Sequence, residues 1–212
     1  MQTKQINEWT GDFGKEYLLR NTFTAEELDS TWKGIFGLTR TEMNAGFLND
    51  LDRNIRILEV GCNVGNQLAC LEKMGFNNLY GIEIFADAVE IARSRGKAQV
   101  IKGSAFDIPF KDNYFDLVFT SSVLIHINPA DLLKATSEIC RVSKKYIFGF
   151  EYYADSFEEI NYRGKTNLLW KGNYPQIYCD NYDMESIKIE KYKYLENNNK
   201  DVMYLLKKVT RI

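Results

Sequence analysis

The sequence contains little of several residue types that mark other classes of protein. Its 212 residues include one histidine and four cysteines, and no two cysteines stand in a C-x-x-C arrangement. Because a structural zinc site takes four such ligands, the sequence predicts no metal site, and we expect the cysteines to be reduced thiols. Only three prolines occur, which argues against a long rigid linker.

Long apolar runs and an excess of charge of either sign are also missing. No stretch of 18 apolar residues occurs, and residues 1–7 lack the apolar core of a signal peptide, so we expect a cytoplasmic protein without a membrane segment. The formal net charge is −2 and the isoelectric point is about 5.6. Such a balance gives no overall attraction for nucleic acid or for an anionic membrane. We therefore expect neither nucleic acid nor a membrane surface as a partner; the oligomeric state leaves no signal in the sequence.

What the sequence does contain is ordinary for a globular domain. Hydrophobic residues make up 45% of the chain and charged residues 26%, and a chain of this length can bury a full core as one domain. We therefore predict a single domain over residues 1–212, with four parts: 1–48, 50–151, 152–183 and 184–212.

The chain is organised around residues 55–67, whose sequence is IRILEVGCNVGNQ. An apolar β-type run ends near Glu59, turns through Gly61 and Gly65, and opens into a helical pattern. Glycine allows a ligand to approach the backbone closely, and a helix N-terminus offers free N–H groups. This pattern predicts a cradle for a nucleotide-type ligand.

Strand and helix patterns alternate from this point. We expect strands at 55–60, 79–83, 98–102, 114–120 and 146–150, and helices at 65–74, 86–95 and 130–141. This alternation predicts an α/β fold, a parallel sheet with helices on both faces. Two alternating runs, 186–195 and 202–208, predict a C-terminal antiparallel β-hairpin that closes the sheet.

The segments on either side of this core are rich in aromatic residues. In residues 1–48, one helix is expected near 13–18, and Thr24 with Glu27 resembles a capping box that starts a second helix, ending near residue 36. These helices either pack on the edge of the domain or form a lid over the cradle. Residues 152–183 show no clean period; they either add a core layer or set the choice of substrate.

The cradle fits the dinucleotide fingerprint G-x-G-x-x-G poorly, because Asn63 and Asn66 occupy glycine positions. It resembles instead the first motif of the class I S-adenosylmethionine-dependent methyltransferases, an acidic residue followed by glycines at alternate positions. Glu59, Gly61 and Gly65 fit that motif, and Asn63 replaces the middle glycine. Asparagine adopts positive φ more readily than most other residues, so the turn remains feasible.

This resemblance covers about residues 50–150 together with the C-terminal hairpin. It implies a Rossmann-like, seven-stranded, mostly parallel sheet, and it implies S-adenosyl-L-methionine as cofactor and S-adenosyl-L-homocysteine as product. Glu83, at the end of the second strand, would accept the ribose hydroxyl protons, and the loop after the third strand would border adenine. If the N-terminal helices form a lid, Tyr17 and Arg20 would face the ligand. The other candidate cofactor-binding residues are Glu59, Gly61, Cys62, Asn63, Gly65, Asn66, Gln67, Glu83, Ile84, Ser104, Ala105, Phe106, Asp107 and Ser121.

Methyl transfer from a sulfonium asks chiefly for in-line positioning, with a base where a proton must leave. His126 follows the fourth strand and is either that base or a residue that orders its loop. Glu151, at the end of the fifth strand, is a second candidate base and otherwise a solvated strand end. The aromatic segments supply candidate substrate contacts, namely Trp9, Tyr152, Tyr153, Arg163, Trp170, Lys171 and Tyr174.

Residues 8–21 and the turn 62–66 resemble a narrower group, the methylases associated with pseudaminic acid biosynthesis in bacteria. That resemblance implies a sugar or nucleotide-linked sugar as methyl acceptor. The D/N-P-P-aromatic motif usual in nucleic-acid amino-methyltransferases does not occur at residues 120–123, which are TSSV. The alternatives are another small metabolite as acceptor, or a cofactor-binding module of the same fold without turnover.

Overall fold

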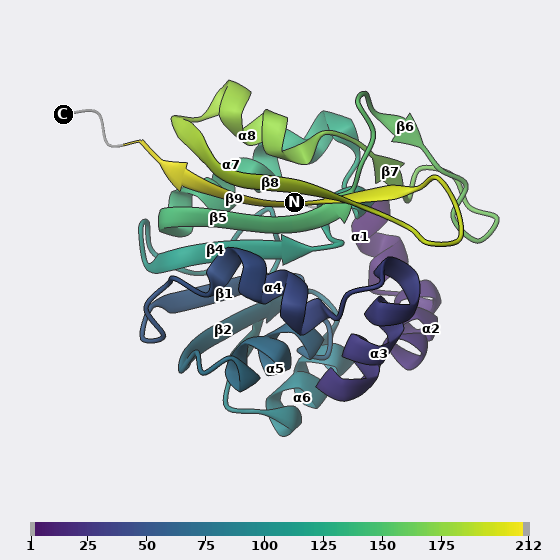
Figure 1. Ribbon diagram of the computed structural model, residues 1–212. Coiled ribbons are helices and arrows are strands. Elements are labelled where there is room, and N and C mark those ends of the chain that lie inside the picture. Colours follow the sequence, from purple (N-terminus) through teal and green to yellow (C-terminus); the bar gives the residue numbers. More distant parts are fainter. Residues whose placement is uncertain (1–2, 210–212) are drawn as a thin grey trace.

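The computed structural model describes residues 3–209. Residues 1–2 and 210–212, which the predicted first and last parts of the chain include, lie outside the described residues. The centre is a seven-stranded sheet in the order β3-β2-β1-β4-β5-β9-β8 (Figure 1). Its strands are β1 (Arg56–Val60), β2 (Asn78–Glu83), β3 (Gln99–Lys102), β4 (Phe115–Ser121), β5 (Ser143–Tyr152), β8 (Met184–Lys193) and β9 (Lys200–Lys208).

The predicted α/β sheet is confirmed. Strands β1 to β5 pair in parallel, whereas β9 is antiparallel to both β5 and β8, so the C-terminal hairpin closes the sheet as expected. The strand order changes direction between β1 and β4. In open α/β sheets, the carboxyl ends of the strands at such a point border the ligand-binding crevice.

Alternate residues of β1 face opposite layers of the molecule. Ile57 packs in one core cluster with Phe47 and Leu71, and Leu58 packs in another with Ile139 and Tyr178. A strand that is apolar on both faces needs cover on both sides. That cover consists of α4 (Arg40–Leu48), α5 (Asn66–Lys73) and α6 (Ala86–Arg95) on one face, and of α7 (Leu132–Val142) and α8 (Tyr174–Asn181) on the other (Figure 1).

Four helices precede the sheet, where the sequence analysis predicts two: α1 (Lys4–Trp9), α2 (Asp12–Arg20), α3 (Ala25–Phe36) and α4. The capping box of Thr24 and Glu27 is confirmed at the start of α3. The same pattern at Thr39 and Glu42 starts α4, which the sequence prediction omits. Helices α1 to α3 lie at the carboxyl ends of the strands (Figure 1).

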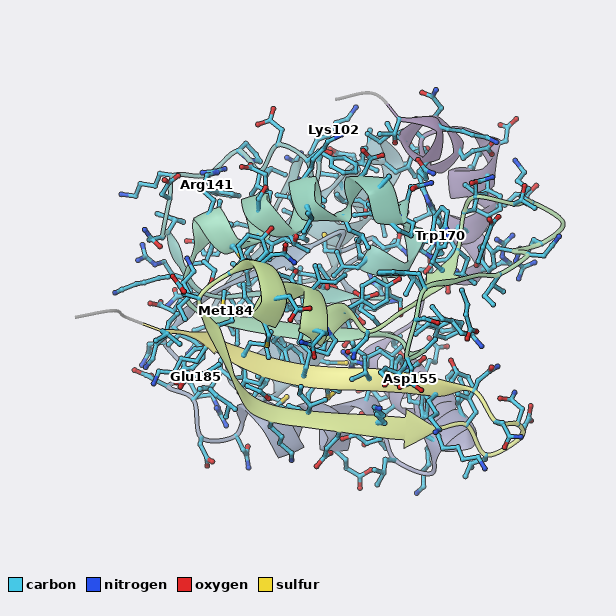
Figure 2. The ribbon with its side chains drawn as sticks, turned by 90° about the horizontal axis from the view of Figure 1, so that it is seen from above. Lys102, Arg141, Asp155, Trp170, Met184 and Glu185 are labelled. Atoms are coloured by element: carbon cyan, nitrogen blue, oxygen red, sulfur yellow. The ribbon has the colours of Figure 1, made fainter. Side chains whose placement is uncertain are left out.

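The segment after β5 contains a short hairpin, β6 (Glu158–Glu159) with β7 (Trp170–Lys171), followed by α8. Figure 2 shows Asp155 and Trp170 at one end of the sheet and Met184 and Glu185 at the other. The hairpin therefore lies at the end that also carries α1, while α8 runs back across the sheet.

Two short 3₁₀ helices, η1 (Leu124–His126) and η2 (Pro129–Asp131), connect β4 to α7. Asn128 caps η2 through its Oδ1, which accepts a 3.0 Å hydrogen bond from the Ala130 amide, and the α-helix itself begins two residues later than the expected residue 130. None of the helices within residues 3–209 is both long and apolar enough to cross a membrane.

Candidate active site

A cavity of about 690 Å³ opens at the carboxyl ends of the central strands. Glu59 and Gly61 from the end of β1, Glu83 from β2 and Ser121 from β4 lie on its wall. Helices α1 to α3, the segment after β5 and the C-terminal hairpin supply the other walls. The volume is in the range of small-molecule binding sites.

The glycine turn after β1 has the backbone that the sequence predicts. Gly61, Asn63 and Gly65 have φ values of 72°, 47° and 78°, which confirms that asparagine here adopts the left-handed conformation. A Cβ on Gly61 would lie 2.7 Å from a methyl carbon of Val123. The turn therefore packs directly on the loop after β4, and a side chain at Gly61 would push the two apart.

The Glu83 carboxylate is held in one orientation by backbone amides. Its Oε2 accepts a 2.9 Å bond from the Asn63 N–H, and its Oε1 accepts bonds of 2.7 and 3.0 Å from the Ile84 and Phe85 N–H groups. Burial raises the pKa of Glu83, and these three hydrogen bonds oppose the shift. A carboxylate oxygen can accept more than one bond, so Oε2 keeps capacity for a hydroxyl donor in the cavity.

Within residues 3–209, Glu59 Oε2 and Gln67 Oε1 are two of the buried oxygens on the cavity wall that lack a protein partner. Burial raises the pKa of Glu59 well above its usual range, while the Arg40 guanidinium lowers it. An unpaired buried acceptor is costly unless a ligand supplies the donor. These two atoms suit a ligand that carries an ammonium group, such as the methionyl end of S-adenosylmethionine.

Arg40 is a completely buried cation beneath this wall. Its guanidinium carbon lies 4.7 Å from the Trp32 ring centroid and 4.5 Å from that of Phe150, and its Nη2 donates to Ser121 Oγ at 3.4 Å. Burial lowers the pKa of Arg40 to about 10, so the side chain stays charged at neutral pH. The charge offsets the buried carboxylate of Glu59.

The loops after β2 and β3 form the far end of the cavity. Ile84 and Phe85 face Ser104, Ala105 and Phe106 across it, as the resemblance implies. Asp107 is exposed and does not line the cavity, and its amide donates back to the Ser104 carbonyl at 3.1 Å. The residue therefore closes a turn at the rim of the cavity.

His126 lies on the cavity wall beneath α1. Its Nδ1 is 2.8 Å from the Leu168 carbonyl oxygen, which fixes Nδ1 as the protonated nitrogen, and its ring centroid is 4.5 Å from that of Trp9. Burial lowers the pKa of His126 to about 4. The imidazole is therefore neutral at pH 7, with Nε2 as its acceptor atom.

Glu151 lies behind the cavity wall, within the protein. It is fully buried, and its two oxygens accept 3.3 Å bonds from the amides of Val123 and Ile125. Burial raises the pKa of Glu151 to about 7. This placement contradicts the expectation of a solvated strand end, because the carboxylate holds the loop after β4.

The cavity gathers most of the expected cofactor residues, but fewer of the expected substrate residues. Trp9, Tyr152 and Lys171 line it. Trp170 and Tyr174 do not, because both rings are buried in the packing beneath the β6–β7 hairpin and α8. The remaining expected residues outside the cavity wall are Arg20, Gly65, Tyr153 and Arg163.

Several cavity residues carry no motif in the sequence. Tyr194, Asn199 and Asp201 come from the C-terminal hairpin, and Trp32 comes from α3. The alternating pattern of the hairpin predicts a strand but not which residues reach a ligand. The one available signal is Asp201 itself, a charged residue at the start of a strand whose next five residues are all apolar or aromatic.

Sheet order, glycine turn and acidic residue after β2 together define the class I methyltransferase fold. The comparisons agree: residues 58–146 match a family model described as a methyltransferase domain. Residues 58–146, which run from β1 into β5, are thus similar in sequence to a methyltransferase domain.

Individual relatives are distant. The chain is 31% identical over 94 residues to norajmaline N-methyltransferase of Rauvolfia serpentina, which covers 41% of this chain and 32% of that enzyme. The chain spans less than half the length of the curated relatives it matches.

Solved structures share the fold over a larger part of the chain. A protein of Pyrococcus horikoshii OT3 has a TM-score of 0.66 at 17% identity, covering 95% of this chain and 96% of that one. A Burkholderia thailandensis 1,6-didemethyltoxoflavin-N1-methyltransferase, solved with S-adenosylhomocysteine and 1,6-didemethyltoxoflavin, has a TM-score of 0.65 at 11% identity, covering 80% and 76%.

Proposed function

We propose that this chain is an S-adenosylmethionine-dependent methyltransferase whose acceptor is a small molecule, a sugar or nucleotide-linked sugar of the pseudaminic acid type. The observation that carries the activity is the Glu83 carboxylate, which backbone amides aim into a cavity of cofactor size beside the glycine turn. The acceptor class rests on the narrower resemblance of residues 8–21 and 62–66.

The residues around the cavity fit each part of the cofactor. Glu83 accepts hydrogen bonds from the ribose hydroxyls, Ile84 with Ser104 to Phe106 contacts the adenine, and Glu59 with Gln67 receives the ammonium group. Tyr17 covers this region from α2. When bound, S-adenosylmethionine supplies a methyl group that is already activated as a sulfonium substituent.

The protein contributes to the chemistry by positioning the acceptor atom against the methyl group. Ser121 at the end of β4, with Ser122 and Val123 after it, lines the cavity, where an acceptor atom would meet the methyl group. Glu151 fixes this loop through the amides of Val123 and Ile125, and His126 anchors it to the segment after β5 through the Leu168 carbonyl. We assign both residues positioning roles, since His126 is a weak base with its pKa near 4.

Calorimetric titration with S-adenosylmethionine tests the cofactor assignment. Glu83→Gln keeps an oxygen for the amides but replaces the other with a donor, and the loss of a charge-assisted hydrogen bond weakens affinity by about 10- to 100-fold. Glu90→Gln, an exposed carboxylate on the adjacent α6, is the matched control and should bind as the wild type does. Equal affinity of Glu83→Gln and Glu90→Gln would remove Glu83 from the site.

Product analysis separates enzyme from binding module. The wild type, incubated with methyl-labelled S-adenosylmethionine and candidate acceptors, should transfer label to a sugar or nucleotide-linked sugar. Label on a nitrogen heterocycle would favour the second candidate, a methyltransferase of another small metabolite, which the similarity to two N-methyltransferases supports. Cofactor binding without label transfer to any acceptor would favour the non-catalytic module.

A further inference from the structure

Five residues at the hairpin side of the cavity form a second polar group, apart from the cofactor residues. We call it the hairpin subsite; its members are Tyr152, Lys171, Tyr194, Asn199 and Asp201, all on the cavity wall. They come from the ends of β5 and β7 and from the hairpin of β8 and β9. Nothing in the cofactor assignment uses them.

Asp201 is the central member of the hairpin subsite. Its side chain is only 2% exposed, its Oδ2 accepts a 3.2 Å bond from the Tyr194 hydroxyl, and its Oδ1 has no partner. An unpaired buried carboxylate oxygen destabilises the fold unless a ligand donates to it. Its position on the wall therefore indicates that a donor enters from the cavity.

Lys171 gives the hairpin subsite an opposite charge. Its Nζ lies 2.6 Å from Asn199 Oδ1 and 5.9 Å from the centroid of the Tyr152 ring. Burial raises the pKa of Asp201 well above its usual range, and the charges of Arg40 and Lys171 oppose that shift. The subsite thus presents an acceptor, Asp201 Oδ1, and near it a donor, the ammonium group of Lys171.

The Asp201 carboxyl group and the Lys171 ammonium group together select the chemistry of the ligand. A cation that reached Asp201 would be repelled by Lys171, and a carboxylate that reached Lys171 would lie near the buried, unpaired oxygen of Asp201. A hydroxyl group both donates and accepts. Neighbouring hydroxyls can therefore satisfy Asp201 and Lys171 together.

The walls of the hairpin subsite suit the apolar face of such a ligand. The rings of Tyr152 and Tyr194 stand edge to face with centroids 6.0 Å apart, and Phe36 packs 4.8 Å from Tyr194. Aromatic faces bind the C–H surface of a ring while polar groups at the edge take its hydroxyls.

We infer that the hairpin subsite binds the polyhydroxylated ring of the methyl acceptor through Asp201, Lys171 and Asn199. This inference deepens the proposed function and rests on it, because the cofactor then fills the other half of the cavity.

Three probes with one common phenyl group test the head-group chemistry: phenyl β-D-glucopyranoside, benzylamine and benzoate. Each is titrated by ligand-observed NMR against the wild type saturated with S-adenosylhomocysteine. We expect the glucoside to bind and the two charged probes to bind at least about tenfold more weakly. Tighter binding of benzylamine or benzoate, or no binding of the glucoside, would overturn the inference.

Asp201→Asn tests the residue itself, since it keeps the shape and an oxygen for the Tyr194 hydroxyl but replaces the unpaired acceptor oxygen with an N–H donor. We expect glucoside affinity to fall about tenfold in this variant, and to stay at the wild-type value in Asp180→Asn, an exposed carboxylate on α8 outside the cavity. S-adenosylhomocysteine affinity should be unchanged in both variants. Unchanged glucoside affinity in Asp201→Asn overturns the subsite, whereas a wild type that fails to bind S-adenosylhomocysteine contradicts the proposed function instead.

Discussion

Glu151 shows how a single buried residue links the fold to solution pH. The carboxyl group is fully buried behind the loop after β4, and burial raises its pKa from 4.5 to about 7. The folded protein therefore holds the proton more tightly than the unfolded chain does. The stability that this group contributes is fully present below pH 4.5 and is lost as the pH rises through 7.

Glu151→Gln should flatten this dependence. In the wild type, the free energy of unfolding should fall by about 3 kcal/mol between pH 4.5 and pH 8 through this group. The variant has no proton to lose, so its denaturant midpoint should vary less over that range. Urea unfolding at a series of pH values measures the difference, with Glu158→Gln on the exposed β6 hairpin as control. Parallel curves for the wild type and Glu151→Gln would contradict the raised pKa.

Among single residues, the sequence predicts those site residues that belong to a local motif. Glu59, Gly61, Asn63 and Glu83 follow fixed spacings along two strands, and the structure brings them to one cavity. Arg40 and Asp201 belong to no ligand-binding motif, and their significance comes from burial among partners distant in the chain. Only the three-dimensional packing reveals such residues.

Gly149 in β5 and Gly34 in α3 differ in the space around them, so the same substitution at each tests how tightly the two elements are packed. A Cβ on Gly149 in β5 would lie 2.1 Å from the ring of Tyr204 on β9, whereas a Cβ on Gly34 in α3 meets no atom within 4 Å. We expect Gly149→Ala to destabilise the protein by about 2 kcal/mol or more through overpacking. Gly34→Ala should stabilise it by up to about 1 kcal/mol, because alanine favours a helix interior.

Thermal or denaturant unfolding of the two variants measures these effects side by side. Each carries the same chemical change, so one serves as the control of the other. A Gly149→Ala protein as stable as the wild type would mean that β5 and β9 can separate locally. That result would also argue against the strand register in which Gly149 faces Tyr204.

Elements with strong periodicity are predicted correctly, whereas α4 is missed although a capping box starts it. The strands of the parallel sheet, the C-terminal hairpin and the start of α3 lie within a few residues of their expected positions. The exceptions are short or lack apolar contrast: α1 has no buried residue, and β6 and β7 contain two residues each. Their positions depend on contacts across the fold, such as the bond from Gln5 Nε2 to the Asn167 carbonyl, which no local pattern encodes.

At the scale of the whole molecule, distant parts of the chain meet over the cavity. Helices α1 and α2 contact the segment after β5 through an ion pair of Glu8 with Lys165 and through the rings of Phe13 and Tyr162, 5.8 Å apart. Trp9 lies against His126 on the same side. We propose that α1 and α2 form a lid that must move for ligands to pass.

Hydrogen exchange tests the lid against the alternative that these helices merely pack on the domain edge. Apart from its N-terminal cap, α1 rests on few buried groups, so its amides should exchange rapidly in the free protein. A ligand that contacts Tyr17 and Trp9 stabilises the closed arrangement, because binding to one conformation shifts the population toward it. We expect S-adenosylhomocysteine to slow exchange in α1 and α2 about tenfold or more, which corresponds to roughly 1.4 kcal/mol of closing free energy.

Helix α7, on the outer face, should exchange at the same rate with and without ligand. Protection confined to the turn at 61–67, with α1 and α2 unchanged, would assign these helices to the domain edge and leave the cavity open on that side.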